Sequence, residues 1–220
     1  MRKIIAIDGP SGAGKSTVAK RLAMEFGFSY LDTGALYRAI ALGLRRAGVP
    51  EDASDDDIRE ALGPIKVTYS EGRVSLNGEL VEEKIREPEV GRLSSVFSAR
   101  KPVREFLLPL QKQAARDNDI VAEGRDMTSV VFPEAWIKIY LDASVESRAK
   151  RRYEQLKGLG IKADMKSATR DVTERDARDS SRDIAPLTRT RDALYIDSSD
   201  MPVDEVVGMV RKTADEGAVK

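Results

Sequence analysis

The sequence predicts an α/β fold in which a parallel sheet is covered by helices on both faces. Short apolar runs, which are typical of buried strands, alternate with longer segments whose apolar residues recur at helical spacing. A glycine-rich turn joins the first of these strands to the first helix. Residues 65–81 alternate apolar and polar residues instead, and they predict a small antiparallel insert outside the main sheet.

Before the insert, the pattern predicts two strands and three helices. They are, in order, a strand at 3–7 (KIIAI), a helix at 14–26, a strand at 28–32 (FSYLD), a helix at 33–48 and a short acidic helix at 51–62. Gly48 and Pro50 end the helix at 33–48, because neither residue favours its continuation. Ser54 is a favourable N-cap for the acidic helix.

The insert contains two turn signals, Glu71-Gly72 and Asn77-Gly78. After it, strands and helices alternate again. The expected elements are helices at 88–98 and 102–116, strands at 119–126 and 136–142, a basic amphipathic helix at 144–160, a last strand at 193–199 and a final helix from about Pro202.

Composition excludes several classes of chemistry. The 220 residues fit one domain with small inserts, and 37 basic residues balance 37 acidic ones, which argues against a general nucleic-acid or membrane binder. The chain has no cysteine and no histidine, so thiol nucleophiles, Ser-His-Asp triads and zinc-hydrolase sites are excluded. No apolar run approaches the roughly 20 residues of a membrane span, and none near the start resembles a signal peptide. We therefore predict a soluble cytoplasmic protein.

Residues 9–16, GPSGAGKS, match the phosphate-binding loop pattern G-x-x-x-x-G-K-[ST], and a strand and a helix flank them as the pattern requires. Backbone N–H groups of such a loop surround phosphate oxygens at a helix N-terminus. Lys15 would reach the β- and γ-phosphates, and the Ser16 hydroxyl would bind Mg²⁺. The predicted ATP-binding residues are Gly9, Pro10, Ser11, Gly12, Ala13, Gly14, Lys15, Ser16 and Thr17.

The segment 174–192 is rich in charge and poor in apolar residues. Its arginines and aspartates form two stripes at helical spacing: Arg175, Arg178 and Arg182, and Asp176, Asp179 and Asp183. Such a helix is commonly a solvated surface. Beside a phosphate-binding loop, we interpret it as a mobile lid whose arginines replace water around a transferring phosphoryl group, while the aspartates keep them soluble in the open state. The chain lacks the guanine-reading N/T-K-x-D motif, so a phosphoryl transferase is favoured over a GTPase.

Four separated segments, GPSGAGKST, LDTGALYRA, AEGRDMTSVVFPEA and ERDARDSSRDIAPL, occur in the order found in bacterial cytidylate kinases. The chain resembles this family of nucleoside monophosphate kinases along nearly its whole length. The resemblance implies a core at 1–32, 100–145 and 190–220, a monophosphate-binding domain at about 33–99 that includes the β insert, and a helical lid at about 146–189.

The resemblance also implies roles for individual residues. The acceptor CMP would contact Thr33, Arg175 and Asp179 through its ribose, Arg38, Arg125 and Arg182 through its phosphate, and Ser95, Arg104 and Asp126 through its base. Lys15, Arg125, Arg178 and Arg182 would be catalytic, with Arg178 reaching the ATP phosphates. Ser94 is the alternative to Ser95.

The chemistry of the residues agrees with cytosine as the base. A carboxylate at Asp126 suits the N4 amino donor of cytosine, and a guanidinium at Arg104 suits its acceptors. Structural roles stay open: Asp126 and Thr33 as helix N-caps, and Arg104 as a surface residue. Asp8 is a candidate second Mg²⁺ ligand.

The sequence therefore predicts transfer of the γ-phosphoryl group of Mg-ATP to CMP and dCMP by a monomer that binds neither nucleic acid nor membrane. Two alternatives remain open. One is a P-loop kinase of UMP or of another small acceptor, and the other is a nucleotide-binding switch without acceptor turnover.

Overall fold

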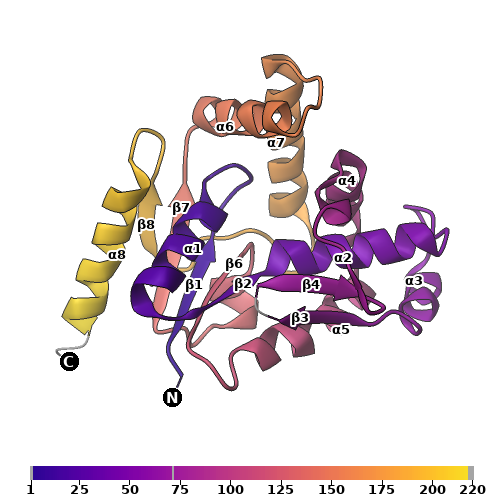
Figure 1. Cartoon of the computed structure of the whole chain (residues 1–220), viewed down its shortest axis with the longest axis horizontal. Helices are drawn as coiled ribbons and strands as arrows, with labels where there is room; N and C mark the ends of the chain where they lie inside the picture. Colours follow the sequence, from indigo (N-terminus) through magenta and orange to yellow (C-terminus); the bar gives the residue numbers. More distant parts are fainter. Residues whose placement is uncertain (1, 71, 218–220) are drawn as a thin grey trace.

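The computed structural model describes residues 2–70 and 72–217 and has the predicted α/β architecture (Figure 1). Five parallel strands form the main sheet in the order β2-β6-β1-β7-β8. Their bounds are β1 (Ile4–Asp8), β2 (Ser29–Asp32), β6 (Ile120–Gly124), β7 (Ile137–Asp142) and β8 (Leu194–Asp197). The helices are α1 (Lys15–Phe26), α2 (Thr33–Arg46), α3 (Asp55–Leu62), α4 (Pro88–Phe97), α5 (Lys101–Ala114), α6 (Val145–Gly158), α7 (Met165–Ser181) and α8 (Val203–Gly217).

Alternate residues of the strands enter two separate apolar cores. In β1, Ala6 faces a core built with α2, α4, α5 and the insert, whereas Ile5 and Ile7 face a core built with α1 and α8. This alternation follows from the two-residue repeat of a strand. Figure 1 shows α8 on one side of the sheet and α2 on the other, which confirms the prediction of helices on both faces.

The insert is a separate antiparallel sheet, as predicted. It consists of β3 (Val67–Ser70), β4 (Arg73–Leu76) and β5 (Glu79–Leu80). Asn77 and Gly78 both have positive φ angles, 51° and 83°, which a type I′ hairpin turn requires. Of the other predicted turn, Glu71 lies outside the described residues. Buried residues of the insert share the core of α2, so the insert is packed onto the main fold.

The chain also contains two short helical turns, and side-chain contacts fix the ends of α3 and α5. A 3-10 turn spans Lys84–Arg86, and a π-helical turn, Met127–Val131, follows β6. Ser54 caps α3 through a capping box with Asp57, which confirms the predicted cap. Arg100, which had no expected role, holds α3 against the start of α5 by bonding Asp55 (Nε to Oδ1, 2.9 Å) and the Ala53 carbonyl (2.6 Å).

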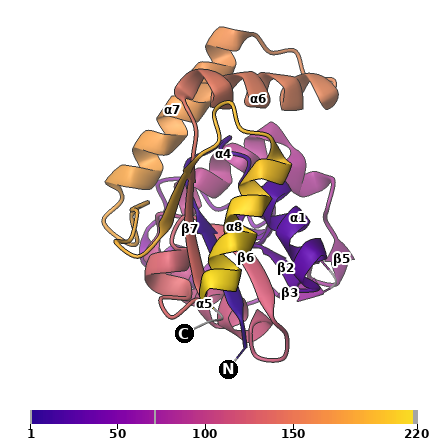
Figure 2. The same cartoon turned by 90° about the vertical axis from the view of Figure 1, so that its left-hand side faces the viewer.

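Helices α6 and α7 lie beyond the carboxyl ends of the strands, at the top of Figures 1 and 2. Both β1 and β6 end toward this side, and each is followed there by residues of interest, the glycine-rich loop and the segment 124–126. Ligands of open parallel sheets bind in this position. Among the described residues, no helix combines the length and apolar character that a membrane span requires.

Candidate active site

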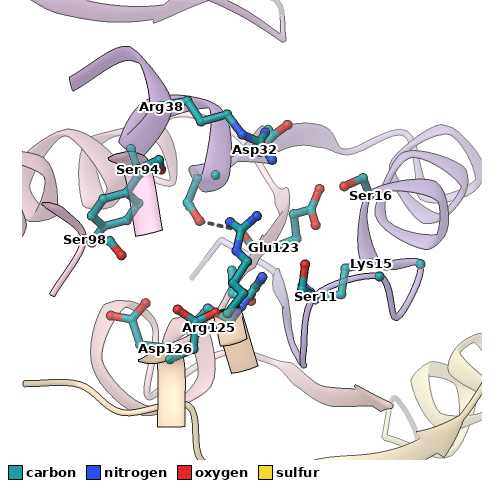
Figure 3. A pocket seen from close by; sticks show the side chains of 18 of the residues that line it. Ser11, Lys15, Ser16, Asp32, Arg38, Ser94, Ser98, Glu123, Arg125 and Asp126 are labelled. Atoms are coloured by element: carbon teal, nitrogen blue, oxygen red, sulfur yellow. Dashed lines mark hydrogen bonds and ion pairs between the residues drawn. The ribbon is translucent and has the colours of Figure 1, made fainter. Parts of the chain in front are cut away.

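A cavity of about 430 Å³ opens between the ends of the strands and the helices α6 and α7. That volume lies in the range of roughly 300–1,000 Å³ typical of small-molecule sites. In Figure 3, Ser11, Lys15 and Ser16 lie on one side of the cavity and Ser94 and Ser98 on the other, with Glu123 and Arg125 between them. The glycine-rich loop and the segment 123–126 therefore face one cavity, although they are more than 100 residues apart in the sequence.

The glycine-rich loop runs from β1 into the first turn of α1 and contains all nine residues predicted to bind ATP. Gly9 has φ of 151°, and a Cβ atom there would lie 1.9 Å from the carbonyl oxygen of Leu141. Only glycine fits this position. The buried Lys15 ammonium donates to the carbonyls of Gly9 (2.8 Å) and Pro10 (2.7 Å) across its own loop. Burial, and then the neighbouring Arg125, lower the pKa of Lys15.

Two carboxylates, Asp32 and Glu123, lie beside Lys15 and Ser16 in the same cavity. Burial, and then the charge of Asp32, raise the pKa of Glu123, while Lys15 lowers it. Sequence reasoning gave neither carboxylate a role. The available signal was their position near strand ends. Asp32 is the last residue of β2, and Glu123 is the second-last residue of β6, which pairs with β2 on one side and on the other with β1, the strand that leads into the phosphate loop.

Asp8, the candidate second Mg²⁺ ligand, does not line this cavity. Its fully buried carboxylate accepts hydrogen bonds from the backbone N–H groups of Met127 (2.8 Å) and Thr128 (2.7 Å) and from the Thr128 hydroxyl (2.7 Å). The residue therefore anchors the π-helical turn to β1.

Arg104 and Asp126 form a buried ion pair on the cavity wall. Their exposed fractions are 8% and 2%, so Arg104 is not a surface residue. The Asp126 side chain makes no capping hydrogen bond to the turn that follows it. Arg104 also donates to the Ser98 carbonyl at 3.1 Å. The alternative of Arg104 as a surface residue is thus wrong. Asp126 does stand at the N-cap position of the π-helical turn, but its side chain pairs with Arg104 and does not cap the turn.

Thr33 is the first residue of α2, whereas the N-cap is Asp32, whose carboxylate accepts from the Ala35 N–H at 2.9 Å. The Thr33 hydroxyl donates to the Glu123 carbonyl at 2.6 Å, so the alternative of Thr33 as the N-cap is wrong. Ser94 lies on the wall of the main cavity, with Arg104. Ser95 lies on an adjoining cavity, where its hydroxyl accepts from Nε of Arg178 at 3.0 Å.

Arginines bring positive charge to the cavity. Arg38, Arg125, Arg175 and Arg182 all line it. Burial, followed by the charges of Arg125 and Arg38, lowers the pKa of Arg175 to about 9. Nε of Arg175 and one terminal nitrogen of Arg182 are buried and have no hydrogen-bond partner within the described part of the chain. Buried guanidinium nitrogens without partners are costly, and they indicate a site for an anion.

The aspartates of α7 do not form the solvated stripe that was expected. Asp179 is 4% exposed and accepts from Nε of Arg125 at 2.7 Å. Asp176 pairs with Arg148 and accepts from the Ser11 N–H of the phosphate loop at 3.0 Å. Their packing against the core explains the discrepancy, because the sequence pattern could not show which partners α7 meets.

The expected single face of arginines is also incomplete. Arg175 and Arg178 lie on α7, but the helix ends at Ser181, and Arg182 follows in an extended conformation. Arg182 nevertheless reaches the main cavity, whereas Arg178 lines the adjoining one with Ser95.

Comparison with known proteins agrees with this arrangement. A sequence model of the family described as cytidylate kinase matches residues 5–216. A cytidylate kinase from Thermodesulfovibrio yellowstonii is 53% identical over 99% of this chain and 100% of its own length. Another, from Thermosipho melanesiensis, is 43% identical over 96% of each chain.

Among solved structures, an uncharacterized protein from Eubacterium ventriosum has a TM-score of 0.52 at 17% identity, covering 97% of this chain and 99% of its own. At that identity, the similarity shows a common fold alone. The sequence matches show the family as well as the fold, because they extend over nearly all of both chains. The chain belongs to the cytidylate kinase family, whose members are phosphotransferases acting on nucleoside monophosphates.

Proposed function

We propose that the protein transfers the γ-phosphoryl group of Mg-ATP to CMP and dCMP, giving ADP and CDP or dCDP. The observation that carries the proposal is the buried Arg104–Asp126 pair, which lies in the same cavity as the phosphate loop and the unpartnered arginine nitrogens. One cavity thus offers a place for a base, for an acceptor phosphate and for a donor phosphate. The family membership supports the same conclusion.

On the donor side, the loop 9–17 would hold the ATP phosphates and Lys15 would neutralise their charge. The residues present suit Mg²⁺, because the Ser16 hydroxyl and the carboxylates of Asp32 and Glu123 are hard oxygen ligands around one corner of the cavity. When bound, the ion would neutralise charge on the phosphate oxygens.

On the acceptor side, Arg38, Arg125 and Arg182 would hold the phosphate of CMP, and Thr33, Arg175 and Asp179 would face its ribose. The acceptor oxygen is already anionic, so alignment with the γ-phosphorus suffices and no general base is needed. These arginines would stabilise the charge that spreads over the transferring group. Arg178 bonds Ser95 of α4 in this structure, so it would reach the ATP phosphates only when the lid moves.

Asp126 would accept a hydrogen bond from the N4 amino group of cytosine. Uracil has a carbonyl oxygen at that position, so it would leave a 2%-exposed carboxylate facing an acceptor. Two acceptors facing each other in a buried site leave a hydrogen bond unmade, and this cost would reject UMP. Of the two serines, Ser94 lies in the cavity with this pair, while Ser95 would act through the lid residue Arg178.

The proposal keeps the division that the resemblance implies: a core, an acceptor-binding domain at about 33–99 and a lid at about 146–189. Closure of the lid over both substrates would exclude water and limit hydrolysis of ATP.

The test is Mg-ATP turnover with CMP, dCMP, UMP and AMP in parallel, for the wild type, Asp126→Asn and Asp183→Asn. Asp183 is an exposed lid aspartate and serves as the control. We expect fast turnover with CMP and dCMP, and a loss of about 10- to 100-fold in kcat/KM for CMP in Asp126→Asn, which corresponds to one hydrogen bond to a charged group. Turnover that no monophosphate accelerates would overturn the proposal in favour of a nucleotide switch. Preference for UMP would favour a different acceptor.

A further inference from the structure

The hydroxyl of Tyr69 connects the antiparallel insert to the main sheet. Tyr69 lies on β3, and β2 is one of the two edge strands of the main sheet. The Tyr69 hydroxyl donates to the carbonyl oxygen of Tyr30 at 2.8 Å and accepts from the N–H of Asp32 at 3.2 Å. A single side chain thus bonds the two backbone groups that a further strand would pair in a wider sheet.

This contact has a clear physical role. Edge strands carry backbone N–H and C=O groups that lack a partner within the sheet, and burying such groups without hydrogen bonds is unfavourable. A phenol can donate and accept at once, which suits it to a carbonyl and an N–H group two residues apart. Burial raises the pKa of Tyr69 to about 12, so the hydroxyl keeps the proton that it donates near neutral pH.

The backbone that Tyr69 holds carries groups of both halves of the active site. Asp32 caps α2, the helix that bears Arg38, and Thr33 follows it with its hydroxyl on the Glu123 carbonyl. The Tyr30 hydroxyl donates to the Glu123 carboxylate at 2.5 Å. The corner between β2 and α2 therefore fixes where the acceptor residues lie relative to Glu123.

We propose that Tyr69 is a positioning residue, whose hydroxyl holds the β2–α2 corner in the shape that acceptor binding needs and thereby makes the insert part of the acceptor site. Tyr69 does not line the main cavity, so it would act through Asp32 and Thr33 rather than on the substrate. The choice of CMP as the acceptor in the assay rests on the proposed function.

The test compares Tyr69→Phe with the wild type and with Val74→Ala. The first removes one hydroxyl and keeps the ring, while the second removes buried apolar volume from β4 of the same insert without removing a polar group. Two quantities are measured: the hydrogen-exchange rate of the Asp32 amide by NMR, and the KM values for CMP and ATP. Melting temperatures show how far each variant is destabilised.

For Tyr69→Phe, we expect the Asp32 amide to exchange about 3- to 10-fold faster and the KM for CMP to rise by a similar factor, which corresponds to one net hydrogen bond. The KM for ATP should rise less than the KM for CMP, because Tyr69 makes no bond to the phosphate loop and is linked to the donor side only through the backbone of Asp32. Val74→Ala should lower the melting temperature more, because it leaves a cavity in the core, yet leave the KM for CMP unchanged.

Two results would overturn the proposal. The first is an Asp32 exchange rate and a KM for CMP that are both unchanged in Tyr69→Phe. The second is a KM for CMP that rises as much in Val74→Ala as in Tyr69→Phe, because the effect would then come from the stability of the insert and not from the hydroxyl. Failure of the proposed function is distinct, since it would appear as a wild type inactive with CMP. The exchange rate of the Asp32 amide would then still show whether the Tyr69 hydroxyl bonds it. The KM comparison would be made with the monophosphate that the enzyme accepts.

Discussion

The two halves of the cavity, proposed to bind the donor and the acceptor, are built in different ways. The donor half is one continuous segment, Gly9 to Thr17, which offers backbone groups and a single buried lysine. The acceptor half joins side chains from α2, α4, α5, β6 and α7, and it holds them with the buried pairs Arg104–Asp126 and Arg125–Asp179.

This difference decides what each half tolerates. A loop that binds through its backbone depends on local geometry, so one added Cβ at Gly9 would collide with Leu141. A pocket made of paired charges depends instead on both members of each pair, because removing one leaves the other buried and uncompensated. Substitutions in the donor half should therefore act mainly on catalysis, and those in the acceptor half on stability and catalysis together.

The largest effect is expected for Lys15→Met in the donor half. The change removes the charge that would face the transferring phosphoryl group, and kcat should fall about 10³-fold, the order found for other cations in this role. Stability should change little, because a lysine whose pKa is lowered by burial is itself costly to bury. Steady-state kinetics and thermal unfolding measure the two effects. Lys20→Met, at an exposed position of α1, is the control. A kcat within tenfold of the wild type would contradict the assignment of Lys15.

The acceptor half should respond differently to Asp126→Ala. Removing this carboxylate leaves Arg104 buried without its partner, and the free energy of unfolding should fall by about 3 kcal/mol. Denaturant unfolding measures the loss. Glu25→Ala, which breaks an exposed pair with Arg211, should cost far less.

The double variant Arg104→Met/Asp126→Leu sharpens the comparison. It replaces the pair by apolar residues of similar size, so stability should largely return while activity with CMP does not. If the double variant were as unstable as Asp126→Ala, the loss would come from packing and not from the uncompensated charge.

The donor half of the site was easier to predict from the sequence than the acceptor half. The phosphate loop was predictable because its residues are adjacent and its geometry needs particular residue types, such as Gly9 and Lys15. Arg104 and Asp126 were identified through the family resemblance, and their pairing needed the fold, because 22 residues separate them in the chain.

The remaining errors have the same physical origin. The pattern of 174–192 predicted a helix but not the residues that Asp176 and Asp179 contact in the fold. Because these aspartates pair with Arg148 and Arg125, they do not form the solvated stripe that the sequence suggested. Asp32 and Glu123 were missed because isolated carboxylates at strand ends match no motif. Tyr69 gave no signal at all, since its contact depends on where the insert packs against the edge of the sheet.

The smallest expected effect concerns Asp8, which links the two halves by joining β1 to the turn after Asp126. Burial raises the pKa of Asp8 from 3.8 to about 6. Between these values the folded protein binds a proton that the unfolded chain has released, so the free energy of unfolding decreases as the pH rises through this window. Between pH 5 and pH 7 the decrease from this residue should be about 1 kcal/mol.

Urea unfolding of the wild type and of Asp8→Asn at several pH values measures this contribution. Asp8→Asn should be less stable overall, because an amide cannot accept all the hydrogen bonds made by Met127 and Thr128, but its stability should depend less on pH. Any dependence that remains would come from other groups such as Glu123, whose pKa is also raised by burial. Equal slopes in the two proteins would mean that Asp8 is ionised in the folded state throughout this range. The turn that follows Asp126 would then be held to β1 by a charged carboxylate and not by a neutral one.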